Sequence, residues 1–231
     1  MSKKAFFVTG TDTGVGKTLI SAALLIAAKN RGLSTAALKP VAAGCEVTAA
    51  GLRNDDALLL QSVITENLTY EQINPVALEP AIAPHIAAQQ AKRVLSVDRL
   101  AGFCRGVLNT ADFTLVEGAG GWRVPLNPSE TLADLPRVLN LPIILVVGVR
   151  LGCISHALLT VEAIARDGLQ LVGWVANLID PEMSNQQENI ASLAQRIAAP
   201  CLAVVPWQEG VASPTVASEA MNGDVVAEFL R

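Results

Sequence analysis

The sequence holds few of the residues that would form a metal cluster or bind a nucleic acid. It has 231 residues, two histidines and four scattered cysteines without a C-x-x-C pair. This spacing disfavours a zinc site and indicates reduced thiols. The net charge is −4 at pH 7, and no block of like charge stands out. A nucleic acid or an anionic membrane is therefore not expected as the main partner.

Long hydrophobic runs are also absent. The longest, Leu141–Val149, is far shorter than the roughly 20 residues that cross a bilayer. Two lysines precede Ala5–Val8, but this run is shorter than the roughly 7–15 residues of a secretory signal. We therefore expect a soluble, cytoplasmic protein.

Short apolar runs alternate with segments of helical periodicity along the chain. The predicted strands are Ala5–Thr9, Thr35–Leu38, Phe113–Glu117, Ile143–Val147, Leu171–Asn177 and Leu202–Pro206. The predicted helices are Thr18–Asn30, Ser96–Leu108, Leu132–Leu139, Ser155–Asp167 and Gln186–Ile197. Continuous apolar strands are typical of a parallel sheet covered on both faces. Without repeats or a linker, the pattern predicts one doubly wound α/β domain over residues 1–231, with a mostly parallel sheet flanked by helices.

Two local features carry separate expectations. Ser184 followed by Gln187 has the spacing of a capping box, which would open the helix that begins near Gln186. The stretch Asn67–Ala91 is rich in proline and turn residues and fits neither period. We expect it to cover the carboxyl edge of the sheet.

The segment "VTGTDTGVGKT", Val8–Thr18, lies between the first predicted strand and helix. It ends in Gly-Lys-Thr, but Thr11 stands where a phosphate loop has its first glycine. Glycines let backbone N–H groups converge on phosphate oxygens, and the helix dipole adds positive potential. Lys17 would reach the β- and γ-phosphates and the Thr18 hydroxyl would ligate Mg²⁺. The simpler alternative is a glycine turn.

Two further strand ends carry charged residues. Glu117 closes an apolar strand, where a second Mg²⁺ ligand would stand, and glycines follow it. Lys39 follows another buried run and could stabilise charge on a transferring phosphoryl group, or simply extend to solvent. Asp55 and Asp56 begin a short helix, where either fits an N-cap as well as a metal ligand.

Taken together, these stretches resemble the dethiobiotin synthetases. The matching segments, in order, are "GTDTGVGKT", "KPVAAG", "GLRNDDALLL", "NP", "PHIAA", "VEGAGGWRVPL", "IILVVGVRLGCISHALLT" and "GWVAN", within about residues 3 to 207. The family's loop also has threonine in place of the first glycine. The resemblance therefore indicates a specialised phosphate loop and a P-loop NTPase-like fold.

The resemblance implies a cyclo-ligase that forms carbon–nitrogen bonds and acts as a homodimer on MgATP, CO₂ and 7,8-diaminononanoate. One substrate amine takes up CO₂ as a carbamate. Its oxygen attacks the γ-phosphate to give a carbamic–phosphoric anhydride, and the second amine closes the ureido ring of dethiobiotin, releasing phosphate. Such chemistry depends on positioning and charge stabilisation.

The resemblance also implies roles for particular residues. Lys17 and Lys39 would be catalytic, and the Mg²⁺ ligands would be Thr18, Asp56 and Glu117. The nucleotide would contact Gly14, Val15, Gly16, Lys17, Thr18, Leu19, Asp56, Glu117, Gly118, Ala119, Gly120, Asn177, Pro206 and Trp207, with Asn177 reading adenine. The diamine would contact Lys39, Gly120, Gly152 and Cys153, the last two near the subunit interface, where a helix N-terminus can receive its carboxylate.

Three positions depart from the family pattern. Gly14 replaces a glutamate of the loop, Ala43 replaces a serine near the reacting amine, and Ser155 replaces an asparagine near the substrate carboxylate. The nucleotide and metal residues match, whereas the substrate residues are altered.

Two alternatives remain. A partition or division-site ATPase switch has a related fold, but it needs a signature lysine early in the loop, where this chain has Asp12 and Thr13. A pseudoenzyme that only binds nucleotide would keep the loop but need not keep Lys39 and Asp56.

Overall fold

A computed structural model describes residues 3–230 of the chain. Its centre is a six-stranded sheet in the order β10-β9-β8-β1-β7-β2, in which every pairing is parallel. The strands are β1 (Lys4–Gly10), β2 (Thr35–Leu38), β7 (Phe113–Glu117), β8 (Ile143–Val149), β9 (Leu171–Leu178) and β10 (Cys201–Val205). The chain passes from β1 to one edge, returns, and then builds the other edge from β8. The switch of direction at β1 is where ligands bind in such sheets.

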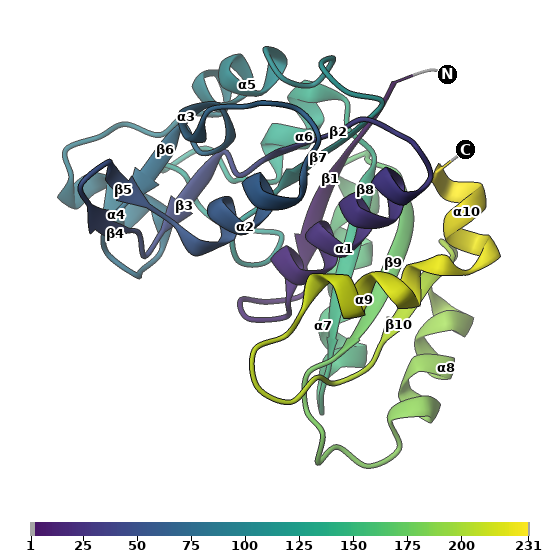
Figure 1. Cartoon of the computed structure of the whole chain (residues 1–231). Coiled ribbons are helices and arrows are strands. Elements are labelled where there is room, and N and C mark those ends of the chain that lie inside the picture. Colours follow the sequence, from purple (N-terminus) through teal and green to yellow (C-terminus); the bar gives the residue numbers. More distant parts are fainter. Residues whose placement is uncertain (1–2, 231) are drawn as a thin grey trace.

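Helices cover both faces of this sheet (Figure 1). One face packs against α1 (Lys17–Asn30), α9 (Pro214–Glu219), η1 (Ala220–Asn222) and α10 (Asp224–Leu230). The other packs against α5 (Val97–Arg105), α6 (Asp134–Leu139), α7 (Cys153–Arg166) and α8 (Gln186–Arg196). Successive residues of β1 alternate between the two cores, with Phe6 and Val8 on the α1 side and Phe7 on the α5 side. This arrangement confirms the predicted α/β sheet flanked by helices.

Residues 39–91 leave the main sheet and form small elements beyond β2, on the left of Figure 1. Strands β3 (Val41–Ala43) and β6 (Val76–Leu78) pair in parallel, and β4 (Glu46–Thr48) and β5 (Gly51–Arg53) pair antiparallel. The helices of this segment are α2 (Asp55–Val63), α3 (Tyr70–Ile73) and α4 (Pro84–Gln90). We call this stretch the 39–91 segment.

The predicted strand and helix ends agree with the structure to within a few residues, but two capping predictions are wrong. Helix α8 begins after Asn185, which has left-handed backbone angles and makes no side-chain cap, so Ser184 and Gln187 form no capping box. Helix α2 is capped by Asn54, whose side chain accepts a hydrogen bond from the Ala57 N–H. Asp55 and Asp56 therefore lie inside the first turn, where Asp56 is left for other contacts.

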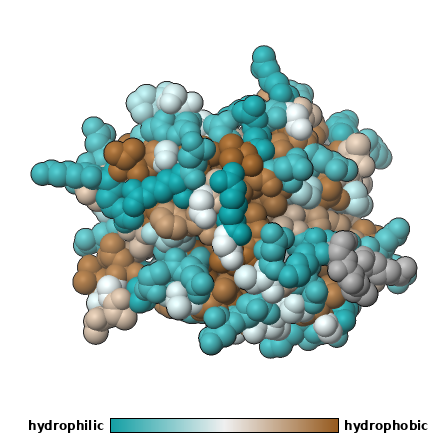
Figure 2. All heavy atoms as spheres, turned by 90° about the horizontal axis from the view of Figure 1, so that it is seen from above, coloured by the Kyte–Doolittle hydropathy of each residue, from teal (hydrophilic) through white to brown (hydrophobic). Residues whose placement is uncertain are grey.

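The described helices include none long and apolar enough to cross a bilayer. Figure 2 views the molecule from above, and on this face hydrophilic side chains repeatedly interrupt the hydrophobic ones. The most exposed large apolar side chains are Val211 at 99% and Leu151 at 89%. Leu151 lies two residues before α7.

Candidate active site

The phosphate loop joins the end of β1 to α1. The hydrogen bonding between β1 and β8 extends one residue beyond β1, because the Thr11 N–H donates to the Val146 carbonyl oxygen at 3.0 Å. Gly14 and Gly16 have φ of 75° and 86°, which side chains other than glycine rarely adopt. Gly16 also packs against the Asn177 amide, so a Cβ there would collide with it. The loop conformation thus depends on these glycines and on strand order, and not on a glycine at position 11.

Asp12 fixes the loop from outside. One carboxylate oxygen accepts a hydrogen bond from the Thr13 N–H at 2.7 Å, and the other pairs with the Arg150 guanidinium at 2.6 Å. Arg150 follows β8, so this ion pair links the loop to the β8–α7 connection. The Lys17 ammonium folds back and donates to the Asp12 carbonyl oxygen at 3.2 Å. Sequence analysis did not anticipate the Asp12–Arg150 pair.

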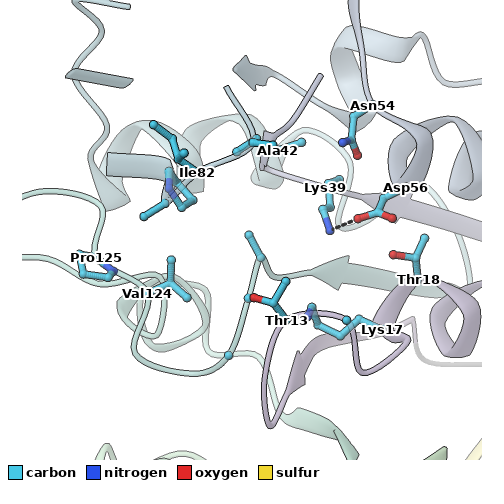
Figure 3. Close-up of a pocket in the computed structure, with 18 of the residues that line it drawn as sticks. Thr13, Lys17, Thr18, Lys39, Ala42, Asn54, Asp56, Ile82, Val124 and Pro125 are labelled. Atoms are coloured by element: carbon cyan, nitrogen blue, oxygen red, sulfur yellow. Dashed lines mark hydrogen bonds and ion pairs between the residues drawn. The ribbon is translucent and has the colours of Figure 1, made fainter. Parts of the chain in front are cut away.

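Lys39, Asp56 and Glu117 form what we call the lysine–carboxylate cluster. The Lys39 Nζ donates to Glu117 Oε1 at 2.6 Å, to Asp56 Oδ2 at 2.8 Å and to the Gly118 carbonyl oxygen at 3.2 Å. The Thr18 hydroxyl donates to the same Glu117 oxygen at 2.8 Å. Figure 3 shows Lys39 pointing at Asp56, with Thr18 and Lys17 nearby at the start of α1. The ends of β2 and β7 and the starts of α1 and α2 therefore meet at one point.

The charges of the cluster depend on one another. Burial acts to lower the pKa of Lys39, but Glu117 and Asp56 outweigh it and raise that pKa above its ordinary value. Burial acts to raise the pKa of Asp56, and the Lys39 ammonium reverses this and lowers it. Burial, together with the positive charge of Lys39, lowers the pKa of Lys17 to about 8. At neutral pH, both lysines therefore carry positive charge at the loop.

A cavity of about 770 Å³ opens beside the loop and the cluster. Its polar end is formed by Thr13, Gly14, Gly16, Lys17, Thr18, Lys39, Asn54 and Asp56. Ile82, Val124 and Pro125 form its apolar end, and the rest of its lining consists mainly of small residues: Ala42, Ala43, Ala81, Ala83, Pro84, Ala119, Gly120 and Gly121, with Arg123. In Figure 3, Ile82, Val124 and Pro125 lie across the cavity from Asp56. Of the stretch Asn67–Ala91, which was expected at the carboxyl edge of the sheet, residues 81–84 line this cavity.

Nine of the residues singled out by sequence line this cavity: Gly14, Gly16, Lys17, Thr18, Lys39, Ala43, Asp56, Ala119 and Gly120. Behind them lie Glu117, which is fully buried, and Gly118, whose carbonyl oxygen accepts a hydrogen bond from Lys39. Val15 is buried in the core, and Leu19 packs against it from α1. These residues were predicted together and lie together.

Other predicted residues lie apart from the cavity within one chain. The Asn177 amide nitrogen donates to the Val15 carbonyl oxygen at 3.0 Å and supports the loop from behind. Pro206 and Trp207 follow β10, and Trp207 is 48% exposed. Gly152 and the buried Cys153 begin α7. Within one polypeptide, none of these five residues lines the cavity beside the lysine–carboxylate cluster.

Most cavity residues that sequence analysis missed are small or apolar. Ala42, Ile82 and Val124 carry no functional group, so no chemical pattern could mark them. Asn54 and Thr13 lay inside the quoted motifs "GLRNDDALLL" and "GTDTGVGKT" but were given no role there. Their proximity became visible only from the course of the 39–91 segment.

The cluster also meets a test for a divalent cation. Glu117 Oε2 is buried without a hydrogen-bond partner, whereas such groups are normally satisfied. Carboxylate and hydroxyl oxygens are the ligands that Mg²⁺ prefers. Among residues 3–230, no three His, Cys, Asp or Glu side chains gather into a metal site. A cation here would therefore share protein oxygens with water or phosphate, as Mg²⁺ does at nucleotide sites.

Solved structures of other proteins share this fold. The chain aligns with the MinC:MinD cell division complex of Aquifex aeolicus at a TM-score of 0.62 and 16% identity, over 98% of this chain and 95% of that one. It aligns with the septum site-determining protein MinD with Mg-ADP from Pyrococcus horikoshii at 0.58 and 17%, over 100% and 93%. With the loop geometry above, these neighbours show that the chain has a P-loop NTPase-like fold.

Closer relatives identify the family. A model of an AAA domain matches residues 4–215. The ATP-dependent dethiobiotin synthetase BioD of Cellvibrio japonicus is 72% identical over 89% of this chain and 90% of its own length. That of Marinobacter nauticus is 55% identical over 96% and 97%. The chain belongs to the ATP-dependent dethiobiotin synthetase family, which confirms the resemblance seen in the motifs and overrides the ATPase-switch alternative.

Proposed function

We propose that this chain is an ATP-dependent dethiobiotin synthetase that carboxylates 7,8-diaminononanoate with CO₂ and closes the ureido ring. Its 72% identity to a named synthetase supports this reading. The observation that carries it is the single cavity in which a phosphate loop and two lysines adjoin an apolar chamber. A substrate with amines at one part of an alkyl chain matches such a division. A switch ATPase has no need of the apolar end.

The reaction joins three reactants in this cavity. One amine attacks the carbon of CO₂ and loses a proton, which gives a carbamate. A carbamate oxygen attacks the γ-phosphorus, and ADP leaves. The second amine then attacks the carbonyl carbon of the anhydride, loses its proton, and expels phosphate. In this scheme Ala42, Ile82 and Val124 contact the alkyl chain.

Lys39 and Lys17 are the residues that stabilise charge in this scheme. Because its pKa is raised, Lys39 stays protonated and presents a fixed positive charge to the carbamate and the transferring phosphoryl group. Lys17 neutralises the β- and γ-phosphates. None of the described residues that line the cavity is a histidine. Preorganised charge and orientation, rather than a histidine base, therefore account for the catalysis.

Thr18, Asp56 and Glu117 would hold Mg²⁺, which would neutralise phosphate charge when bound with ATP. The buried, unpartnered Glu117 Oε2 supports this assignment. The loop from Gly14 to Leu19 and the Gly118–Gly120 turn would contact the phosphates. Asn177, Pro206 and Trp207 would contact the adenine.

We also propose a cytoplasmic homodimer. Leu151, two residues before α7, and Leu159, midway along it, are 89% and 62% exposed. A second copy packed on this face would cover them and bring its Gly152–Cys153 backbone toward the substrate carboxylate. The oligomeric state in solution tests the dimer by itself.

One assay tests the function. Purified protein with MgATP, bicarbonate and diaminononanoate should release phosphate only when all three are present, with one dethiobiotin formed for each phosphate. ATP hydrolysis that ignores the diamine would instead favour an ATPase switch. Nucleotide binding with no turnover would favour a pseudoenzyme.

A further inference from the structure

A chain of buried hydrogen bonds runs behind the lysine–carboxylate cluster, through two residues of the 39–91 segment. The Asn54 N–H donates to the Tyr70 hydroxyl at 2.8 Å, and that hydroxyl donates to Asn74 Oδ1 at 3.0 Å. The Asn74 amide nitrogen then donates to the Lys39 carbonyl oxygen at 2.7 Å. One end of the chain is therefore the main chain of Lys39, and the other is the residue that caps α2.

At each end, this series of hydrogen bonds holds a stretch of backbone that carries a side chain of the lysine–carboxylate cluster. The Lys39 peptide is held on both sides, since its N–H donates to the Ile73 carbonyl oxygen at 2.8 Å while its carbonyl oxygen accepts from Asn74. At the other end, Asn54 caps α2, and Asp56 is the second residue of that helix. The chain thus sets the separation between the two main chains whose side chains meet at 2.8 Å in the Lys39–Asp56 ion pair.

The environment makes each of these hydrogen bonds matter. Asn54, Tyr70 and Asn74 are 9%, 6% and 3% exposed, so water cannot replace a lost partner. The Arg53 guanidinium lies over the Tyr70 ring, 4.1 Å from its centroid, and fixes the ring from the outer side. Tyr70 has one polar side-chain atom, and it serves both neighbours. Its removal would leave a buried N–H and a buried amide oxygen unpaired together.

We propose that Tyr70 and Asn74 are positioning residues that hold Asp56 and Lys39 in register for MgATP. This inference rests on the proposed function, in which Asp56 helps to hold Mg²⁺ and Lys39 faces the transferring group. Residues that orient metal ligands typically change metal affinity or activity by about 10–100-fold when altered. The phosphate loop lies at a different strand end, so the network acts on the magnesium-dependent part of nucleotide binding.

The test compares Tyr70→Phe with Thr35→Val. Thr35 lies at the other end of β2, where its hydroxyl accepts from the Thr65 N–H at 3.0 Å just beyond α2, and its side chain is also buried. Both variants therefore lose one buried hydroxyl that accepts a main-chain N–H next to α2, from its N-cap in Tyr70→Phe and from just beyond its last turn in Thr35→Val. ATP binding is measured by calorimetry with and without Mg²⁺. In Tyr70→Phe, the factor by which Mg²⁺ raises ATP affinity should be smaller by about 10–100-fold. Binding without Mg²⁺ should be unchanged, and Thr35→Val should resemble the original chain in both.

Asn74→Ala interrupts the same series of hydrogen bonds at its second side chain. It should reduce the Mg²⁺-dependent increase in ATP affinity by the same factor. Adding Tyr70→Phe to Asn74→Ala should then lower this increase by less than about threefold more, because residues in one network are not additive. If Tyr70→Phe did not fold, Asn74→Ala would decide by the same titration. The proposal would be overturned if Mg²⁺ raised the ATP affinity of the folded Tyr70 and Asn74 variants as much as it raises that of Thr35→Val. Since the titration needs no dethiobiotin, a failed synthetase assay would leave this result independent.

Discussion

The phosphate loop and the lysine–carboxylate cluster share one cavity, but they are built in different ways. The loop is one continuous stretch between β1 and α1, and its form depends on backbone angles at Gly14 and Gly16. The cluster takes Lys39, Asp56 and Glu117 from three places in the chain and holds them through ion pairs of the buried Lys39 with the buried Glu117 and the partly exposed Asp56. The loop therefore offers backbone N–H groups in a fixed shape, whereas the cluster offers charges whose values depend on each other.

This difference shows where a single substitution acts. In the loop, binding of phosphate is shared among many N–H groups. In the cluster, one ammonium touches both carboxylates and one carbonyl oxygen. Loss of that ammonium removes several contacts together. The largest functional effects should therefore come from the cluster.

Lys39→Ala should give the largest loss of turnover. Loss of one preorganised electrostatic group typically costs about 10²–10³ in rate, and ATP affinity should change little because Lys17 and the loop remain. Steady-state kinetics and calorimetry of ATP binding measure the two effects separately. Turnover close to that of the original chain would mean that Lys39 is a structural strand-end lysine.

Stability needs its own control, because the same change leaves Glu117 buried without its cation. Removing one partner of a buried pair typically costs about 3–5 kcal/mol in the free energy of unfolding. Lys39→Met with Glu117→Gln removes both charges and should recover part of that stability, while turnover stays low. Recovery of turnover in the double variant would contradict a direct role for the Lys39 charge.

Thr18→Val should have the next largest effect and tests the point where the loop meets the cluster. The substitution removes the hydroxyl that donates to Glu117 at 2.8 Å and would also serve Mg²⁺. We expect MgATP affinity to fall by about 10–100-fold, with a higher magnesium requirement. ATP binding without Mg²⁺ should fall far less. Equal losses with and without Mg²⁺ would indicate damage to the loop itself.

The same contrast explains what the sequence could predict. The strands are continuous apolar runs, and the loop is a contiguous motif, so both could be read from neighbouring residues. Glu117 and Lys39 stood at strand ends, and the order of strands brought them together. The positions of β3 and β6 could not be predicted, because three-residue strands have no period to detect.

Contacts that depend on the tertiary fold were also out of reach. Tyr70 and Asn74 are four residues apart, yet they join Lys39 to Asn54 only because α3 packs beside the end of β2. The capping box at Ser184 failed for a related reason. Asn185 adopts left-handed angles, which asparagine tolerates better than most residues, and the helix starts after it. A capping motif read from the sequence is therefore not formed where a neighbouring residue suits the backbone angles at the start of the helix better.

The pH dependence of ATP binding sharpens the comparison on the loop side. The pKa of Lys17 is lowered to about 8, so its charge is present below that pH and is lost as the pH rises through it. Phosphate favours the charged form, and ATP affinity should therefore fall by about tenfold between pH 7 and pH 9. Calorimetry at fixed Mg²⁺ measures this, and Lys17→Met should bind weakly with a flat profile. An equally steep profile in Lys17→Met would assign the titration to another group.

Ala43→Ser should have the smallest effect and tests the part of the cavity where we expect the diamine to bind. Ala43 ends β3, is half-buried and lines the cavity, where a serine hydroxyl could reach the reacting amine or its carbamate. A net hydrogen bond contributes about 0.5–1.5 kcal/mol, so kcat/KM for diaminononanoate should rise by about two- to tenfold. ATP affinity should hardly change, because the phosphate loop follows β1 and not β3. Ala81→Ser places the same hydroxyl elsewhere on the cavity wall and should give no rise. A large loss in Ala43→Ser alone would mean that the cavity is shaped around the smaller side chain, and diamines of shorter and longer chain would then show which substrate length it fits.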